Sequence, residues 1–375
     1  MKNSFSNIFR GLRVLLTGHT GFKGSWLAIW LRELGAQVTG YSLEPPTNPS
    51  NFELTNLSKR LINVQGDVND FPKLLETFKK CKPQLVFHLA AQSLVLKSFQ
   101  TPQQTFATNT QGTVNVLEAM RLIKSVKAAV MVTSDKCYEN QNFVWGYREN
   151  DSLGGHDPYS ASKSAAELAI ASYRDSFFAP ENYANHRLSL SSVRAGNVIG
   201  GGDFADTRLI PDCFRALLAR KPIILRQPQN IRPWQHVLEA LSGYLWLAVK
   251  LLKEGPHFAE AWNFGPLEQT GISAALVAKK TVELWGEGSW KTAKSSPCNL
   301  ERTQLRLNWD KALNRLDWRP VYNWEEALAQ TVQWFKSYQN EVNKHNEKND
   351  LYNLDVLQIR RYSQKAKSKK LKWAL

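Results

Sequence analysis

A glycine-rich turn directly after a short apolar strand constrains the fold of this chain more than any other feature. The strand predicted over residues 12–17 leads into the motif TGHTGFKG at 17–24, and an amphipathic helix is predicted over 22–34. Glycines allow a tight turn, let backbone N–H groups approach a pyrophosphate and let the helix pack closely on the strand. The order of strand, glycine turn and helix therefore predicts a dinucleotide site at the start of a Rossmann-type sheet.

The rest of the first half alternates apolar runs with helical patterns, as βαβ units do. Further strands are predicted over 37–42, 61–65, 84–89, 128–133 and 188–195, and the helices between them over 70–80, 105–124 and 158–178. These elements predict an α/β fold with a doubly wound parallel sheet, which forms a dinucleotide-binding domain over residues 10–200.

After about residue 200 the pattern becomes less regular. Residues 200–203 read GGGD, and prolines separate shorter elements. We expect a smaller mixed α/β lobe over 201–340 that holds the substrate, with some of this chain returning to the core and a closing helix over 324–336. Residues 341–375 are polar and basic, so we assign them no fold and expect a solvated tail.

The charge of the chain indicates an anionic partner. Lysine and arginine number 48 against 33 acidic residues, a net charge of +15, and residues 360–375 contain seven basic residues and no acidic one. A phosphorylated metabolite, nucleic acid or an acidic membrane surface would each satisfy this excess.

Other compositional features exclude several classes of protein. No apolar run approaches the ~18 residues of a membrane-spanning helix, and the first residues show no clear cleavage site. Four cysteines are too far apart for metal spacing and too few for a disulfide scaffold: Cys81, Cys137, Cys213 and Cys298. We therefore expect reduced thiols, no metal and a cytoplasmic location.

One motif pairs a phenol with an ammonium on a predicted helix. In YSASK, Tyr159 and Lys163 are one helical turn apart and share a face. The ammonium is expected to lower the pKa of the phenol, so that the pair removes a hydroxyl proton while hydride leaves the same carbon.

A second motif gathers polar groups where the strand over 128–133 ends. Ser134, Asp135 and Lys136 follow it, at the carboxyl edge of the predicted sheet where the cofactor crevice opens. The cluster suits acid–base chemistry, and a surface Asp–Lys pair explains the same residues equally well.

The second and third strands leave the choice of dinucleotide open. Ser42 stands where an acid is expected to bind the adenosine ribose, and Glu44 comes two residues later. No arginine is placed to bind a 2′-phosphate, which favours NAD over NADP. Asp67 either bonds the adenine amine or begins a helix.

With these residues in view, the chain resembles the extended short-chain dehydrogenase/reductases that act on nucleotide sugars. Four motifs agree in order, TGHTGFKG, HLAAQ at 88–92, TSDKCYEN at 133–140 and YSASK, and the resemblance covers about residues 10–340. Within this family the chain is most similar to the CDP-glucose 4,6-dehydratases. The dTDP-glucose enzymes carry Thr-Asp-Glu where this chain has Ser-Asp-Lys, and the epimerases generally lack such an acid–base pair.

The resemblance implies a reaction in which hydride passes from sugar C4 to NAD and returns to C6. Tyr159 would take the 4-hydroxyl proton, and Ser134 would hydrogen-bond the 4-oxygen. Lys136 would remove the C5 proton, which requires a depressed pKa, and protonated Asp135 would assist loss of the 6-hydroxyl.

The resemblance also implies binding residues and an assembly. The cofactor would contact Thr17, Gly18, Gly21, Phe22, Gly24, Asp67, Val68, Leu89, Ala90, Ala91, Thr133, Tyr159 and Lys163. The substrate would contact Gln92, Ser134, Asn197, Arg208 and Arg232. A homodimer would form through the helices over 105–124 and 158–178, with Leu117, Met120, Leu168 and Ile170 buried between subunits.

Two alternative functions remain open at this point. A nucleotide-sugar 4-epimerase would invert C4 without loss of water. A nucleic-acid or anionic-surface binder would use the basic tail on a Rossmann scaffold, but interleaved aromatic residues and an RNA-binding motif are missing. We therefore expect CDP-glucose as the partner, and neither nucleic acid nor a membrane.

Overall fold

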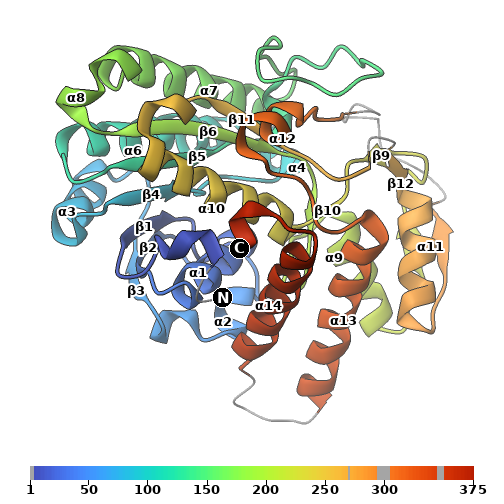
Figure 1. Cartoon of the computed structure of the whole chain (residues 1–375). Helices are drawn as coiled ribbons and strands as arrows, with labels where there is room; N and C mark the ends of the chain where they lie inside the picture. The colour runs from blue at the N-terminus through green and yellow to red at the C-terminus, as the bar shows by residue number, and fades with distance from the viewer. Residues whose placement is uncertain (1–3, 269–270, 294–304, 344–349) are drawn as a thin grey trace.

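A seven-stranded parallel sheet forms the centre of the computed structural model, which describes residues 4–268, 271–293, 305–343 and 350–375 (Figure 1). Its strands are β1 (Arg13–Thr17), β2 (Gln37–Ser42), β3 (Ile62–Gln65), β4 (Leu85–His88), β5 (Ala128–Val132), β6 (Ser189–Ala195) and β11 (Ala261–Phe264). The order across the sheet is β11-β6-β5-β4-β1-β2-β3, and each of these pairings is parallel. The predicted doubly wound sheet is confirmed.

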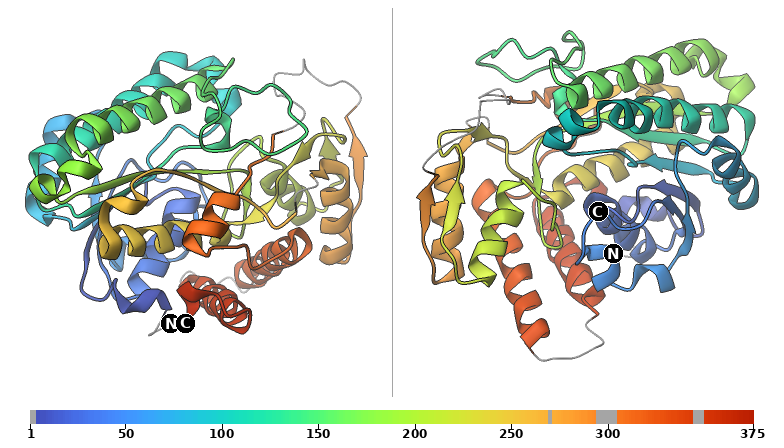
Figure 2. Two further views of the ribbon diagram at one scale, coloured as in Figure 1. Left: turned by 45° about the horizontal axis from the view of Figure 1, so that its top comes forward. Right: turned by 180° about the vertical axis from the view of Figure 1, so that it is seen from behind.

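Helices cover both faces of the sheet (Figure 2). On one face lie α1 (Phe22–Glu33) and α10 (Val237–Glu254), and on the other α3 (Phe71–Cys81), α6 (Gly112–Leu122) and α7 (Pro158–Phe177). Successive side chains of a strand point to opposite faces, so Val14 and Leu16 of β1 join the first core and Leu15 joins the second. Because both faces of the central strands are buried, β1, β4 and β5 read as nearly continuous apolar runs.

The remaining elements connect these layers or build the second lobe. The short helices are α2 (Asn51–Leu54), α4 (Val95–Gln100), α5 (Pro102–Phe106), α8 (Tyr183–His186) and α12 (Asp310–Leu316), with one π-helical turn over Ala107–Gln111. The second lobe contains α9 (Leu209–Leu218), α11 (Ala274–Trp285) and α13 (Trp324–Asn343). Three small strand pairs complete it: β7 (Val198–Ile199) with β10 (Gln235–His236), β9 (Ile231–Arg232) with β12 (Ile272–Ser273), and β8 (Ile223–Leu225) with β13 (Trp290–Thr292).

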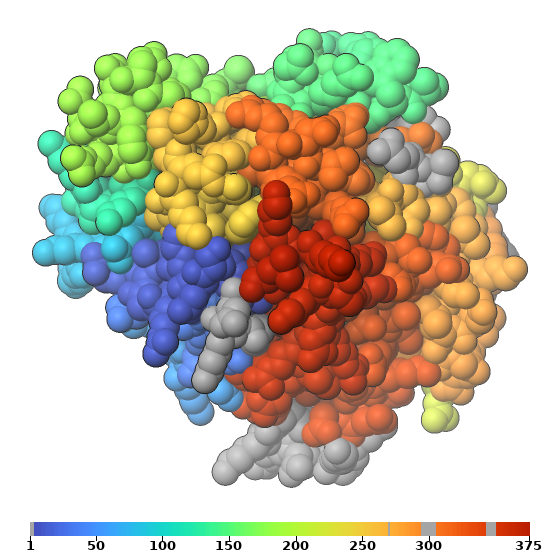
Figure 3. All heavy atoms as spheres, in the orientation of Figure 1, coloured from blue at the N-terminus to red at the C-terminus, as the bar shows by residue number. Residues whose placement is uncertain are grey.

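The C-terminal segment differs from the expected solvated tail. The C-terminal residues cover part of the surface of the molecule (Figure 3). Helix α14 (Tyr352–Ser368) lies beside α1, and Tyr362 and Trp373 are fully buried. Trp373 stacks on Phe5 with ring centroids 5.1 Å apart, which brings the two ends of the chain together. The sequence prediction failed because the buried stripe of this helix is narrow and its other faces are polar.

Several basic residues of this segment form ion pairs within the protein. Lys365 pairs with Glu326, Lys372 with Asp317 at 2.9 Å, and Arg360 with Glu33 at 3.6 Å. These ion pairs attach α14 and the residues after it to α13, to the end of α12 and to α1.

The predicted dimer surface also needs correction. Leu117, Met120 and Ile170 are buried within the subunit itself, in the core between α6, α7 and the sheet. Of the four residues assigned to an interface, Leu168 alone is exposed, with 61 % of its surface accessible. The sequence shows that a helical residue is apolar, but it does not show whether the residue is buried within its own subunit or between two subunits.

No helix in the described part of the chain is both long enough and apolar enough to cross a bilayer.

Candidate active site

The glycine turn lies at the point where the strand order of the sheet reverses, between β1 and β4. Gly18 has φ +77°, and a Cβ atom there would come within 2.6 Å of the Ala90 nitrogen. A Cβ atom on Gly24 would come within 2.1 Å of the Gly18 carbonyl oxygen. Both glycines are therefore required for the close approach of α1, the turn and the loop after β4.

Helix α1 presents its first backbone N–H groups at this turn. It begins at Phe22, after the N-cap Gly21, and no described side chain caps it. Uncapped N–H groups and the positive end of the helix dipole suit a phosphate group. The residues present therefore fit the pyrophosphate of a dinucleotide.

Thr17 fixes the neighbouring loop. Its hydroxyl hydrogen-bonds His88 Nδ1 at 2.7 Å and accepts the N–H groups of Leu89 and Ala90 at 3.2 and 3.3 Å. The predicted cofactor residues 89–91 thus follow β4 directly and lie against the glycine turn.

Asp67 does not begin a helix. Its Oδ1 accepts the backbone N–H of Asn69 at 2.9 Å, whereas the N-cap of α3 is Asp70, which accepts the N–H of Lys73 at 3.1 Å. Beside it, the carbonyl oxygen of Val68 accepts a bond from Asn115 at 2.8 Å. The helix-capping alternative for Asp67 is excluded, and its contact with adenine stays a prediction.

Ser134, Asp135 and Lys136 form the turn after β5, at the carboxyl edge of the sheet. The Ser134 hydroxyl donates to Asp135 Oδ1 at 3.0 Å, and its oxygen accepts the N–H of Lys136 at 3.2 Å. Asp135 is buried, and its Oδ2 has no hydrogen-bond partner within the described residues. Burial raises the pKa of this carboxyl, against the opposing charges of Lys136, Arg232 and Lys23.

Tyr159 and Lys163 lie on one face of α7 and are both buried. Burial raises the pKa of Tyr159 to about 12, although the nearby Ser134 hydroxyl opposes the shift. Burial lowers the pKa of Lys163 to about 8, and the nearby Glu167 carboxylate opposes that shift. The pKa of Tyr159 is thus raised, and the lowering predicted from the ammonium is not found in the protein alone.

Two residues that the sequence did not single out also face this site. Lys23, in the first turn of α1, holds its Nζ 5.7 Å from the ring centre of Tyr244 on α10. Burial and the charges of Arg208 and Lys163 lower the pKa of Lys23 to about 8. The Tyr244 hydroxyl is buried and has no partner among the residues described.

Three of the predicted substrate residues lie on different elements of the second lobe or on the connection that leads to it. Arg208, at the N-terminus of α9, donates to Asp203 at 3.2 Å and to Ser93 at 3.1 Å. Arg232 on β9 is buried and close enough to Asp135 to affect its pKa. Asn197, between β6 and β7, accepts the N–H of Gln235 through its carbonyl oxygen at 3.2 Å.

Gln92 forms hydrogen bonds within the protein, and its contact with the substrate stays a prediction. Its amide nitrogen donates to the Leu94 carbonyl at 3.0 Å and to Thr105 at 3.1 Å, and its amide oxygen accepts the N–H of Leu94 at 2.7 Å. The side chain of Asn109, in the π-helical turn, accepts the backbone N–H of Gln92 and donates to the Gln92 carbonyl oxygen. It also donates to the Ser162 hydroxyl on α7. Gln92 therefore orders the loop after β4.

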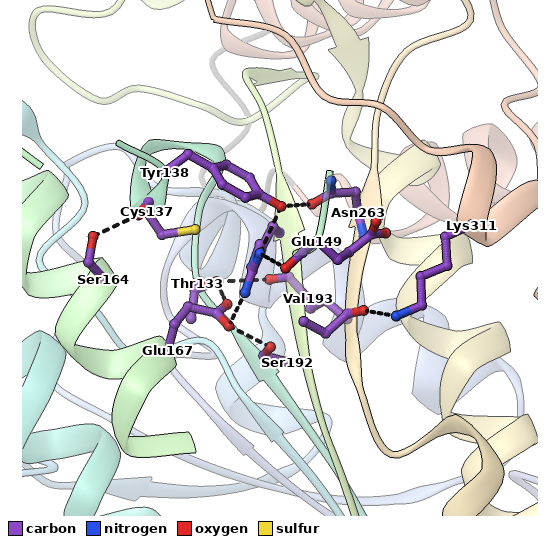
Figure 4. A network of polar contacts seen from close by, with 12 residues as sticks. Thr133, Cys137, Tyr138, Glu149, Ser164, Glu167, Ser192, Val193, Asn263 and Lys311 are labelled. Atoms are coloured by element: carbon purple, nitrogen blue, oxygen red, sulfur yellow. Dashed lines mark hydrogen bonds and ion pairs between the residues drawn. The ribbon is translucent and has the colours of Figure 1, made fainter. Parts of the chain in front are cut away.

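A buried ion pair connects the elements that carry these residues (Figure 4). Glu167 on α7 accepts Arg194 on β6 at 2.8 Å, Ser192 at 2.7 Å and Thr133 at 2.5 Å. Arg194 also donates to the Tyr138 hydroxyl at 2.8 Å. Burial alone would raise the pKa of Glu167, but Arg194 and these hydrogen bonds together lower it.

Sequence reasoning missed Glu167, Arg194 and Lys23, although each left a signal. Glu167 is one helical turn beyond Lys163, on the face that also carries Tyr159. Arg194 is a single charge inside an otherwise uncharged strand, where an isolated charge requires a buried partner. Lys23 stands inside the glycine motif itself.

Comparison with known proteins identifies relatives over most of the chain. Residues 15–331 match the family described as GDP-mannose 4,6 dehydratase. The chain is 48 % identical over 333 residues to the CDP-glucose 4,6-dehydratase of Salmonella typhimurium, covering 88 % of this chain and 92 % of that protein. It is 26 % identical to the dTDP-D-glucose 4,6-dehydratase of Mus musculus, covering 90 % and 91 %.

Solved structures share the fold. An epimerase from Methanothermobacter thermautotrophicus aligns with a TM-score of 0.76 at 24 % identity, covering 92 % of this chain and 97 % of that one. The dTDP-glucose 4,6-dehydratase of Bacillus anthracis, solved in complex with NAD, aligns with a TM-score of 0.70 at 22 % identity, covering 88 % and 98 %.

The Glu167–Arg194 pair predicts a large stability difference between two isosteric substitutions. Glu167→Gln removes the charge that pairs with a buried guanidinium, so it should lower the free energy of unfolding by about 3–5 kcal/mol. Glu118→Gln is the matched control, because Glu118 pairs with Arg121 at the surface, and its cost should stay below about 1 kcal/mol. Urea denaturation measures both, and equal costs would contradict the structural role of the buried pair.

Proposed function

The chain belongs to the GDP-mannose 4,6 dehydratase family, and from this membership we propose that it removes water from CDP-glucose to give CDP-4-keto-6-deoxyglucose. The resemblance to extended short-chain dehydrogenase/reductases is thereby confirmed. One observation carries the proposal beyond the family: a buried carboxyl with a raised pKa and an unpartnered Oδ2, Asp135, lies beside the Tyr159–Lys163 pair.

NAD is the proposed cofactor. The Gly18–Gly24 turn and the N-terminus of α1 would hold its pyrophosphate, and Ala90 and its neighbours after β4 would line the cofactor crevice. Bound NAD supplies a hydride acceptor that also returns the hydride, so the reaction needs no external oxidant.

Tyr159 is the proposed acceptor of the 4-hydroxyl proton. The Ser134 hydroxyl is close enough to affect the pKa of this phenol, and Ser134 would bind the sugar 4-oxygen. Lys163, one helical turn along α7, would favour the phenolate through its positive charge. Tyr159 and Lys163 are both buried, so water is largely excluded from this proton transfer.

Asp135 and Lys136 distinguish dehydration from epimerisation. A carboxyl kept neutral by burial has a proton to donate, and Asp135 would give it to the departing 6-hydroxyl. Lys136, next in the chain, would remove the C5 proton. A 4-epimerase needs neither group, which makes that alternative the weaker one.

The second lobe is proposed to hold the nucleotide diphosphate. We assign the dinucleotide-binding part to residues 10–200 and most of the substrate lobe to 201–340. Arg208 and Arg232 would bind the phosphates because a guanidinium fork donates to two oxygens at once. Asn197 precedes both arginines in the chain and follows β6.

Binding of nucleic acid or of an anionic surface is the weakest of the three functions. Lys365, Lys372 and Arg360 of the C-terminal segment form ion pairs within the protein. These ion pairs partly neutralise the charge of the segment. They also attach α14 and the residues after it to the rest of the protein.

We further propose a cytoplasmic homodimer. The three cysteines in the described ranges, Cys81, Cys137 and Cys213, are unpaired thiols, which fits a reducing compartment, and Cys298 lies outside those ranges. Leu168 on α7 and Phe106 on α5 are exposed apolar residues on neighbouring helices. They are proposed as the centre of the interface in place of the residues buried within the subunit.

The assignment of Lys136 predicts a stalled reaction. With CDP-glucose and NAD, Lys136→Ala should complete hydride transfer from C4 and then stop, so that reduced nicotinamide accumulates on the enzyme. Absorbance in a single turnover measures this, and deuterium at C5 should not exchange with solvent. Lys127→Ala, an exposed lysine at the other end of the same strand, should behave as the parent. Full dehydratase turnover by Lys136→Ala, or loss of cofactor binding, would show that Lys136 is not the base.

If Leu168 lies at the centre of the interface, one charged side chain placed there should dissociate the dimer. Sedimentation at micromolar concentration should give about twice the subunit mass of 42.6 kDa for the parent and the subunit mass for Leu168→Glu. Leu276→Glu, on the exposed face of α11, is the control and should leave the dimer intact. A parent that sediments as a single subunit would refute the dimer.

A further inference from the structure

Asp355 on α14 is a buried carboxyl that the proposed mechanism does not use. Its side chain is fully buried, and both of its oxygens accept hydrogen bonds, Oδ2 from the Asn51 amide at 2.8 Å and Oδ1 from the Trp334 indole at 2.6 Å. Burial raises the pKa of Asp355 to about 7, and the two hydrogen bonds oppose this shift. Because burial of a carboxyl is costly, packing alone does not explain this residue.

Both partners of this carboxyl pack on the backbone of the GGGD loop, residues 200–203, where the second lobe begins. A Cβ atom on Gly202 would come within 2.5 Å of Asn51 Oδ1, and one on Gly201 would overlap the ring of Trp334. Gly202 also has φ +77°, a conformation that other residues rarely adopt. The path of the GGGD loop is therefore set by the side chains of Asn51 and Trp334.

The amide of Asn51 is held in one orientation. Its nitrogen donates to Asp355 and, at 3.0 Å, to the hydroxyl of Ser25 near the start of α1, so both of its N–H bonds are used. The amide oxygen is then directed at Gly202. Without the carboxylate of Asp355 the amide can rotate, and its contact with the loop changes.

The GGGD loop ends at Asp203, which holds Arg208. Asp203 is buried, and its carboxylate accepts the backbone N–H of Ala205 at 3.1 Å and the Arg208 guanidinium at 3.2 Å. Arg208 is close enough to Tyr159 and Lys23 to affect the pKa of both. The position of the loop therefore determines where this guanidinium lies in the site.

We propose that Asp355 is a positioning residue for the substrate diphosphate. Its bonds to Asn51 and Trp334 fix the GGGD loop, and the loop in turn fixes Arg208. This inference rests on the proposed function, in which Arg208 binds a phosphate. Helix α14 lies beside α1, and Asp355 bonds to α13 (Figure 1), outside residues 15–331 that match the family. The C-terminal segment thus supports the substrate site from beyond the shared part of the chain.

Asp355→Asn tests this role at pH 8, where the parent carboxyl is ionised. The substitution keeps the size of the side chain but replaces one acceptor oxygen by a donor, so the bond to Asn51 or to Trp334 is lost. The loop should shift and stay folded, because Trp26 still donates to the Gly201 carbonyl at 2.9 Å. We expect the KM for CDP-glucose to rise about tenfold, with kcat and the affinity for NAD within about twofold of the parent.

Three comparisons show whether Asp355 acts through Arg208. In an Arg208→Ala background, Asp355→Asn should raise KM by less than about twofold, because changes that act through one contact are not additive. Asn51→Asp combined with Asp355→Asn exchanges donor and acceptor and should restore most of the parent KM. Asp350→Asn is the matched control, since Asp350 lies in the same segment and pairs with Arg60 at the surface, and its KM should equal that of the parent.

The outcomes separate this inference from the proposed function. A parent that does not convert CDP-glucose refutes the function and the inference with it. With an active parent, an unchanged KM for Asp355→Asn, an equally large rise in the Arg208→Ala background, or a loss confined to kcat refutes the inference alone. If Asp355→Asn does not fold, as judged by circular dichroism, Trp334→Phe repeats the comparison, because it removes the other N–H donor and keeps an aromatic ring.

Discussion

The ion pair between Glu167 and Arg194 is the contact on which the active site depends. It joins α7, which carries Tyr159 and Lys163, to β6, and through Thr133 it reaches the end of β5, where Asp135 follows. The catalytic groups therefore stand on rigid elements that one buried interaction holds in place, and such groups are positioned more accurately than groups on free loops. Removal of either partner would leave an uncompensated charge inside the protein.

The buried carboxyls of Glu167 and Asp135 have opposite pKa shifts. Glu167 accepts hydrogen bonds from a guanidinium and from two hydroxyls, so its pKa is lowered and it is ionised. Asp135 has cations nearby, but one of its oxygens has no partner in the described structure, and burial raises its pKa. A structural anion and a potential proton donor thus arise from the same residue class, because their hydrogen-bonding environments differ.

Sequence alone predicted what depends on local pattern. The strands, the glycine turn and the groups that follow β4 and β5 came from periodicity and spacing, since the carboxyl ends of parallel strands meet at one edge. Contacts between distant segments were not predictable in this way. The burial of Trp373 against Phe5, the internal role of Gln92 and the burial of Leu117 within its own subunit each depend on packing that no local pattern reveals.

The central claim is that hydride leaves C4 and returns to C6 of the same sugar while water is lost. CDP-glucose that carries deuterium at C4 tests it directly, with the product analysed by NMR and mass spectrometry. The account predicts a 4-keto-6-deoxy product with the deuterium at C6 and none released to solvent. Deuterium that remains at C4 of a CDP-hexose of unchanged mass would contradict it and would indicate an epimerase.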